Sequence, residues 1–239
     1  MNEGPTRIMI GLFALAAGAA ATAAVMGSGT AVNTADRAQI EKIVRDYILS
    51  HPEILPEAMD NLRAREVAKA VQANRSAIET PFAGAWEGAT NPDVTVVQFF
   101  DYNCSYCRAS MADIDKLLAA DKRVRIVYRE FPVLGPDSEN AARISLAAAK
   151  SGKYAAFHRA VYAAGRPEPR AIERIAKDLG VDIAFATTPA AQAEVTANLN
   201  LARPLALSGT PSWVIGDRVL SGAVGYEALK EAVAAARAK

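Results

Sequence analysis

The stretch that decides the fold is Val94–Arg108, which reads VTVVQFFDYNCSYCR. Its first half is a β-branched and aromatic run that is apolar on both faces, as expected of a central strand buried on both sides. Its second half holds Cys104 and Cys107, the two cysteines of the chain. A structural disulfide, half of a metal site and a reactive dithiol are the competing interpretations of this pair.

The sequence after the cysteine pair continues as an α/β unit. Apolar residues at helical spacing follow the pair as far as Leu118, and Val124–Tyr128 is a second β-branched run. This order of strand, helix and strand is typical of a parallel crossover unit. Helical patterns separated by glycines and prolines come next, at 138–150, 153–163, 169–179 and 189–202.

Strand signals return near the C-terminus. Trp213–Ile215 and Arg218–Leu220 are joined by Gly216–Asp217, a two-residue link typical of a hairpin. A last helix is predicted from Tyr226 to about Ala236. The order βαβ, helical insertion, ββα places the chain in the α/β class.

The N-terminal residues predict export. Ile8–Met26 is an almost wholly apolar run, long enough to cross a bilayer as a helix, and Arg7 gives it the positive flank that favours a cytoplasmic N-terminus. We favour an uncleaved inner-membrane anchor over a cleaved signal peptide, for which the small residues from Ala21 to Ala24 offer a site. In both cases the rest of the chain is expected in the periplasm.

Two amphipathic helical patterns precede the main domain. The second begins at Ser50–Glu53, with a serine cap and a proline in the first turn, and runs to about Ile78. The first has an apolar side made of Ile40, Ile43, Val44, Tyr47 and Ile48. We expect these helices either to pack on the domain or to form a homo-oligomer through residues 36–75, because a large exposed apolar surface is usually buried in an interface.

Export makes a disulfide between the two cysteines possible, because exported proteins meet oxidising conditions. A disulfide stabilises mainly by closing a loop in the unfolded chain, and Cys104 with Cys107 closes almost none. At the start of a helix, however, free backbone N–H groups and the helix dipole favour a thiolate at Cys104. Cys107 falls on the same helical face, so it can displace a disulfide formed by Cys104. The pattern therefore favours a reactive dithiol.

Composition and histidine spacing bear on the other classes of function. A closed zinc site usually needs four ligands, and His51 and His158 have no ligand-like spacing to the cysteines, so we predict no metal site. Copper(I) held by the two thiolates stays open as a rival. The net charge is +1 and no basic cluster occurs, so we predict no nucleic-acid partner.

The stretch FFDYNCSYCR, followed after the helical block by Gly209–Trp213 (GTPSW), resembles the DsbA family of thioredoxin-fold thiol–disulfide oxidoreductases. The likeness runs from Asp36 to the C-terminus and is greatest to the exported or membrane-anchored bacterial branch with an N-terminal helical extension. It implies a thioredoxin fold with three parts: a signal anchor or signal peptide plus linker at 1–35, the extension at 36–80, and a DsbA domain at 81–239 whose insertion covers 137–203.

The same resemblance assigns roles to four residues. Cys104 would be the exposed nucleophile and Cys107 the buried resolving cysteine. Pro211 would be a cis-proline that faces them, and Thr210 would offer its backbone to an extended substrate. It further implies no cofactor besides the redox-active cysteine pair, substrates that are unfolded or misoxidised secreted proteins, and a membrane redox partner that resets the pair.

Two positions depart from the family pattern. Many relatives carry a glutamate six residues before the first cysteine, where this chain has Gln98, which cannot accept a proton from the resolving thiol. Ser105–Tyr106 stands where strongly oxidising relatives have a histidine, so a milder oxidant is expected. We therefore predict an exported thiol–disulfide oxidoreductase, in the first place an oxidase, that forms or exchanges disulfides through a Cys-Ser-Tyr-Cys site. An isomerase or reductase of the same fold and a non-enzymatic copper-binding envelope protein are the alternatives.

Overall fold

The computed structural model describes residues 34–165 and 168–238. The chain divides between Met59 and Asp60 into two compact units, and this division falls inside helix α3 (Ile54–Glu79). The candidate anchor at 8–26 lies outside the described residues. Among the residues that are described, no helix is both long and apolar enough to cross a membrane.

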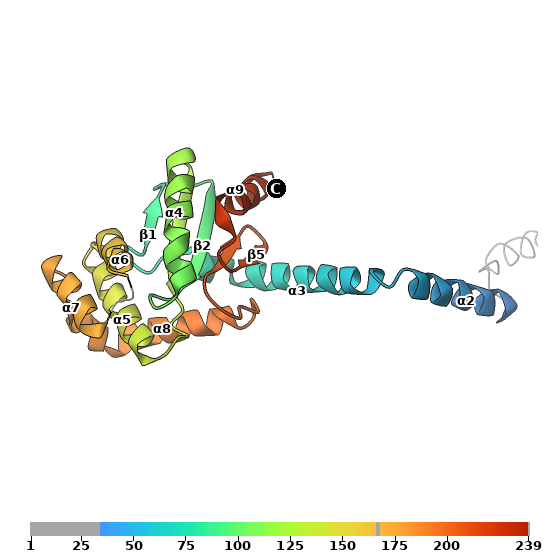
Figure 1. The fold of residues 1–239 in the computed structure, drawn as a ribbon, viewed down its shortest axis with the longest axis horizontal. Helices are drawn as coiled ribbons and strands as arrows, with labels where there is room; N and C mark the ends of the chain where they lie inside the picture. Colours follow the sequence, from blue (N-terminus) through green and yellow to red (C-terminus); the bar gives the residue numbers. More distant parts are fainter. Residues whose placement is uncertain (1–33, 166–167, 239) are drawn as a thin grey trace, which may run out of the picture. The chain divides into compact units, whose positions relative to one another are not determined.

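The second unit is built on a five-stranded sheet in the order β1-β3-β2-β4-β5 (Figure 1). The central strand β2 pairs in parallel with β3, and the pairs β1–β3, β2–β4 and β4–β5 are antiparallel. The edge strand β1 was not predicted from the sequence. The strands are β1 (Trp86–Gly88), β2 (Val94–Phe100), β3 (Val124–Glu130), β4 (Ser212–Ile215) and β5 (Arg218–Ser221).

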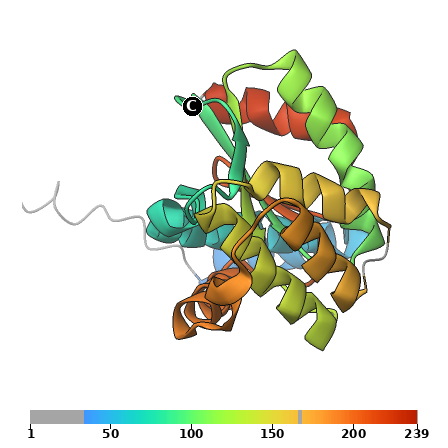
Figure 2. The ribbon, with the colours of Figure 1, turned by 90° about the vertical axis from the view of Figure 1, so that its left-hand side faces the viewer.

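Helices cover both faces of this sheet, and side chains alternate between the two faces as the strand geometry requires. Val96 and Phe100 of β2 belong to the larger core, which also holds residues of α4 and α9, whereas Val97 and Phe99 face a second core with α3 and the end of α8. The helices α4 (Ser105–Ala120) and α9 (Gly225–Arg237) lie side by side (Figure 2). The buried, doubly covered central strand expected from VTVVQFF is therefore confirmed.

The helical insertion between β3 and β4 also matches the expectation from sequence. Its helices α5 and α6 pack against each other, and their buried residues belong to the same core as those of α4 and of the sheet. The elements are α5 (Pro136–Lys150), α6 (Tyr154–Ala163), α7 (Pro169–Asp178), the 3₁₀ turn η1 (Ile183–Thr187) and α8 (Pro189–Ala202). The order βαβ, insertion, ββα is that of the predicted thioredoxin fold.

The second half of α3 packs as part of the domain rather than as a separate extension. Val71 and Ile78 are fully buried in the same core as Phe99. The buried Arg129 of β3 donates hydrogen bonds to the carbonyls of Ala77, Ile78 and Thr80, groups that a helix end leaves without partners. Packing therefore continues across the boundary that the sequence suggested between residues 80 and 81. The other extension helix, α2, spans Thr34–Ser50.

Candidate active site

Cys104 lies between the end of β2 and the first turn of α4, where it is the N-cap residue of the helix. Its Sγ atom accepts a hydrogen bond from the Cys107 backbone N–H at 3.4 Å. Both cysteines are free thiols, and an N-cap acceptor satisfies one of the N–H groups that the helix start leaves unpaired. The sequence placed the pair at this junction correctly, because a strand pattern ends just before it.

The two thiols differ sharply in exposure. Cys104 retains 7% of its surface exposed, and Cys107 retains 0%. The resemblance implied an exposed outer cysteine, whereas the observed opening is narrow. A reagent therefore reaches Cys104 only, and it must approach through this small opening.

The pKa values of the two thiols are displaced in opposite directions. The pKa of Cys104 falls from 9.0 to about 5, chiefly because the Cys107 thiol donates a hydrogen bond to it; the Thr210 hydroxyl and the N–H groups of Cys107 and Tyr106 add to this, and burial opposes it. Burial, together with that same donation, raises the pKa of Cys107. At neutral pH the outer sulfur is thus a thiolate and the inner sulfur a thiol, the division that disulfide exchange requires.

The loop before β4 lies directly against the outer sulfur. Cys104 Sγ lies 3.2 Å from the Thr210 carbonyl oxygen, to which it donates a hydrogen bond when it is protonated, and the Thr210–Pro211 peptide bond is cis. Two hydrogen bonds fix this loop: Ser212 Oγ donates to the Gly209 carbonyl at 2.7 Å, and the Gly222 N–H donates to the Pro211 carbonyl at 2.8 Å. The four residues singled out from the sequence therefore come together in space.

Asp101 organises the turn that carries the cysteines, and sequence reasoning gave it no role. Its buried carboxylate accepts hydrogen bonds from the backbone N–H of Asn103 at 2.8 Å, Val133 at 2.9 Å and Leu134 at 3.0 Å. The loops after β2 and β3 are thus tied to one carboxylate. An aspartate directly after a buried strand was the available signal, but its partners are far away in the sequence.

The helical insertion holds the same turn from behind. Tyr102 places its hydroxyl 2.8 Å from Ser145 Oγ and 3.0 Å from His158 Nδ1. The Tyr162 hydroxyl donates to the Asp101 carbonyl at 3.1 Å. Each of these contacts joins the catalytic turn to α5 or α6, so the insertion fixes the position of the cysteines.

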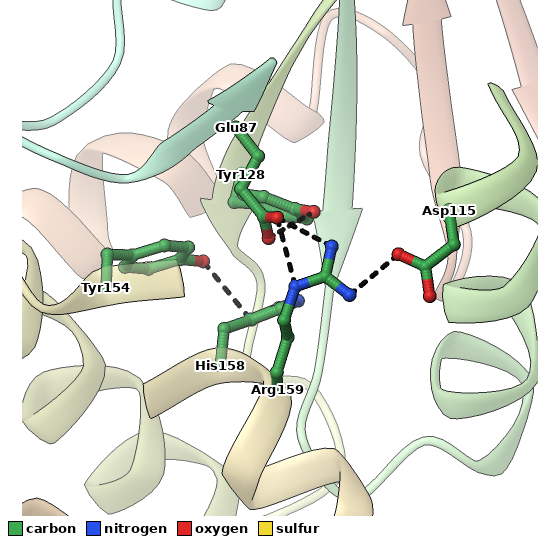
Figure 3. A network of polar contacts seen from close by, with 6 residues as sticks. All are labelled: Glu87, Asp115, Tyr128, Tyr154, His158 and Arg159. Carbon is green, nitrogen blue, oxygen red and sulfur yellow. Dashed lines mark hydrogen bonds and ion pairs between the residues drawn. The ribbon is translucent and has the colours of Figure 1, made fainter. Parts of the chain in front are cut away.

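A neighbouring ion-pair network ties α6 to the sheet and to α4 (Figure 3). Arg159 lies 2.6 Å from Glu87 of β1 and 2.7 Å from Asp115 of α4. Tyr128 donates to the same Glu87 at 3.2 Å, and the Tyr154 hydroxyl lies 3.4 Å from His158 Nδ1. His158 is thereby held inside a ring cluster. Burial lowers its pKa to about 3, so it is neutral at physiological pH.

No metal-binding cluster of three or more His, Cys, Asp or Glu side chains occurs in the described part of the chain. Gln98, the position that departs from the family pattern, is buried on β2, and neither polar atom of its amide has a protein partner.

An ionised cysteine at a helix start, a buried second cysteine and an adjoining cis-proline on this fold define a thioredoxin-type thiol–disulfide oxidoreductase domain. The chain belongs to the family of DSBA-like thioredoxin domains, whose sequence model matches residues 95–234. Residues 36–69 match a second model, that of the N-terminal domain of the copper resistance protein ScsC.

Solved structures agree with this assignment. A linker-deletion variant of ScsC from Proteus mirabilis is 28% identical, covers 88% of this chain and 99% of its own, and superposes with a TM-score of 0.71. A thioredoxin-like oxidoreductase from Silicibacter pomeroyi is 41% identical over 70% of this chain and 99% of its own, with a TM-score of 0.65. The thiol–disulfide exchange protein alpha-DsbA2 from Wolbachia pipientis is 26% identical over 73% of this chain and 97% of its own, with a TM-score of 0.66.

Among curated proteins, the Na(+)/H(+) antiporter NhaA 3 of Salinispora tropica is 28% identical over 156 residues, which are 62% of this chain. The chain spans about a quarter of the length of that relative, since the match covers 24% of it. The shared part is therefore a module that also occurs inside a much longer protein.

Proposed function

We propose that the chain forms or exchanges disulfide bonds in secreted or envelope proteins, with Cys104 as the nucleophile and Cys107 as the resolving cysteine. The observation that carries this proposal is the opposite displacement of the two thiol pKa values at a site where only Cys104 is exposed. No cofactor besides the cysteine pair is invoked.

In the oxidising direction, a substrate thiolate attacks the Cys104 sulfur of the Cys104–Cys107 disulfide, and the Cys107 sulfur leaves with the bonding electron pair. A second substrate thiolate then attacks the substrate sulfur of the mixed disulfide. Cys104 is released as a thiolate, which its low pKa makes a good leaving group. The substrate gains a disulfide and the site is left reduced.

The Thr210 backbone supports the binding of an extended substrate segment beside Cys104. The loop leads into β4, and a chain that adds to it would pair as an additional strand. Such main-chain recognition suits an enzyme with many unfolded or misoxidised substrates. A membrane redox partner would reoxidise the pair; with a partner that supplies electrons, the same site would act as an isomerase or reductase.

The test is oxidation of a reduced secreted protein by the wild type and by Cys104→Ala, Cys107→Ala and the control Ser221→Ala, at an exposed position of β5. We expect no turnover with Cys104→Ala, trapped mixed disulfides with Cys107→Ala and normal turnover with Ser221→Ala. Undiminished activity of Cys104→Ala would overturn the proposal. Equilibration of the pair with glutathione then gives the reduction potential, which distinguishes an oxidase from a reductase.

Copper binding is the rival that one observation favours, namely the match of residues 36–69 to a domain named for copper resistance. Two thiolates can hold Cu(I). Titration of the reduced protein with Cu(I), run beside the oxidation assay, separates the two functions. Tight binding without exchange activity would favour the rival.

We propose that the extension forms a homo-oligomer through residues 36–75. Five large apolar side chains of α2 are exposed by half or more: Ile40 by 52%, Ile43 by 60%, Val44 by 50%, Tyr47 by 53% and Leu49 by 67%. Light scattering of the chain with and without residues 36–59 tests this idea, and an unchanged mass would end it. The truncation ends at residue 59, just before the second unit, because removal of residues up to 75 would also remove the buried Val71.

We also propose a periplasmic location with residues 8–26 as an inner-membrane anchor. The apolar character of that segment supports it, and a neighbour from Salmonella enterica serovar Typhimurium, 27% identical with a TM-score of 0.64, is described as periplasmic. Fractionation of cells that express the chain with and without residues 8–26 tests both parts.

A further inference from the structure

The turn that leads into Cys104 is closed by a single carbonyl group. The Asp101 carbonyl accepts a hydrogen bond from the Cys104 backbone N–H at 3.1 Å and another from the Tyr162 hydroxyl at 3.1 Å. The first bond joins residues three apart, as in a β-turn, and makes Tyr102 and Asn103 the central residues. The group that places the backbone of Cys104 is therefore also bound by a buried phenol of α6.

Side chains of the helical insertion hold the two central residues of this turn as well. Asn103 Nδ2 donates to Ser138 Oγ at 2.9 Å, and Ser138 is buried in the first turn of α5. The Tyr102 hydroxyl lies 2.8 Å from Ser145 Oγ and 3.0 Å from His158 Nδ1. Each of the three residues before Cys104 is thus bonded to a side chain of the insertion.

The place of Cys104 decides how well its sulfur is stabilised. Cys104 has the extended backbone of an N-cap, with φ −84° and ψ 115°, and its Sγ accepts the Cys107 backbone N–H at 3.4 Å. A hydrogen bond to an ionised acceptor is about twice as strong as one between neutral groups, and the effect of the helix dipole is confined to the first turn. Displacement of the Cys104 backbone would therefore cost a thiolate more than a neutral sulfur.

The redox state changes what holds this sulfur in place. In the oxidised form, the covalent bond to Cys107 fixes the Cys104 sulfur against α4, and the sulfur carries no charge. In the reduced form, which is the one described because both thiols are free, the sulfur is placed by the backbone of the turn. Contacts that hold the turn should therefore stabilise the reduced form more than the oxidised form.

We propose that Tyr162 and Ser138 are positioning residues that hold the Cys104 sulfur at the start of α4 in the reduced protein and thereby make the cysteine pair more oxidising. This inference rests on the proposed function. Tyr162 acts through the Asp101 carbonyl, and Ser138 acts through the side chain of Asn103. A dithiol that is stabilised in its reduced form takes up electrons more readily, so the insertion strengthens the oxidant.

The test is the equilibrium of the full chain with glutathione at pH 7. Two glutathione thiols supply two electrons to the Cys104–Cys107 disulfide; glutathione disulfide, a Cys107 thiol and a Cys104 thiolate form, and one proton is released. Tyr162→Phe keeps the ring and removes the hydroxyl. We expect the equilibrium constant for reduction of the pair to fall about 5-fold, which corresponds to a potential about 20 mV more negative.

A control variant for Tyr162→Phe is available in the same helix. Tyr154 is also a buried phenol of α6, and its hydroxyl lies 3.4 Å from His158 Nδ1, within that helix rather than in the turn (Figure 3). Tyr154→Phe should therefore have the equilibrium constant of the wild type. An equal constant in Tyr162→Phe and the wild type would overturn the inference, and so would a fall of the same size in Tyr154→Phe.

Ser138→Ala provides a second measurement, which decides the matter if Tyr162→Phe does not fold. It removes the acceptor of the Asn103 amide, and we expect the same constant to fall about 3-fold. The effect should be smaller because Asn103 is half-buried and its amide can bond to water. Ser151→Ala is the control, since its hydroxyl donates to the Ala147 carbonyl at the other end of α5. A Ser138→Ala constant equal to the wild type would contradict the proposed role of this serine.

Urea unfolding of both redox forms separates positioning from a general structural role. Tyr162→Phe should destabilise the reduced form more than the oxidised form, because the disulfide replaces the restraint that the turn provides. An equal loss of stability in the two forms would identify the hydroxyl as purely structural and overturn the inference. A wild-type pair that does not exchange with glutathione would instead overturn the proposed function.

Discussion

The core between the sheet and the helices α4 to α6, here called the layer, and the helix α2 both contain large apolar and aromatic side chains, which are buried in the layer and exposed on α2. Phe100, Tyr102 and Phe157 are buried in the layer, where Phe100 meets the ring of Tyr102 edge-on at 5.0 Å between centroids. Ile43 and Tyr47 of α2 are more than half exposed. An apolar pattern in the sequence therefore indicates a face that is stabilised by burial, but it does not indicate which surface buries that face.

The difference has a consequence for how each region works. In the layer, the partners of every apolar side chain come from the same chain, so the catalytic turn is held rigidly. In α2, Ile43 and Tyr47 are exposed, and in the proposed homo-oligomer a second copy of the chain would cover them. The comparison therefore places the proposed chemistry in the first region and the proposed assembly in the second.

The largest expected effect on stability comes from a substitution in the buried layer. Phe100→Ala removes a fully buried ring that contacts Tyr102, Tyr128, His158 and Tyr162. We expect a loss of about 3–5 kcal/mol in the free energy of unfolding, measured by urea denaturation of the isolated unit starting at residue 60. A loss below ~1 kcal/mol would mean that the layer is not closely packed.

A smaller effect is expected where a polar group holds the turn. Asp101→Asn keeps the size of the side chain but replaces the charged acceptor of three backbone N–H groups with a neutral one. We expect a loss of about 1.5–3 kcal/mol in the free energy of unfolding. Asp113→Asn, at a partly exposed position of α4, is the control. Equal stability of the two variants would show that this carboxylate does not fix the loops.

The next effect depends on pH and on the redox state of the buried region. The pKa of Cys104 is lowered from 9.0 to about 5 in the folded, reduced protein. A lowered pKa stabilises the folded state above the unfolded pKa, and this stabilisation is lost as the pH falls through the folded pKa. The reduced form should therefore lose stability relative to the oxidised form between about pH 9 and pH 5. Unfolding of both forms across this range measures it, and a constant difference would contradict an ionised Cys104.

The smallest effect on folding is expected on the exposed side. Replacing Ile43 and Tyr47 with serine should change the free energy of unfolding of the domain by less than ~0.5 kcal/mol, because these side chains have no buried contacts to lose. The same double variant should reduce the mass of the full chain measured by light scattering. A stability loss comparable with that of Phe100→Ala would remove the distinction between the two regions.

Much of the fold could be read from local patterns. The run VTVVQFF predicts a buried strand because both of its faces are apolar, and the cysteine pair follows it at the helix start. The edge strand β1 was missed because Trp86–Gly88 is three residues long and too short to show a period. Packing of the second half of α3 on the domain was one of two alternatives left open by the sequence, because the helical period of Val71 and Ile78 does not reveal which surface they face.

The sequence by itself determined the order of the elements, the βαβ…ββα architecture and the position of two thiols at a strand–helix junction, because each follows from residues that are neighbours in the chain. Only the tertiary structure decided that Asp101 binds the loop after β3 and that Tyr102 and Tyr162 tie the cysteine-bearing turn to the helical insertion. Those relations join residues that are distant in the chain. Burial and hydrogen bonding, which set the pKa values of the site, exist only once the sheet and its helices have packed.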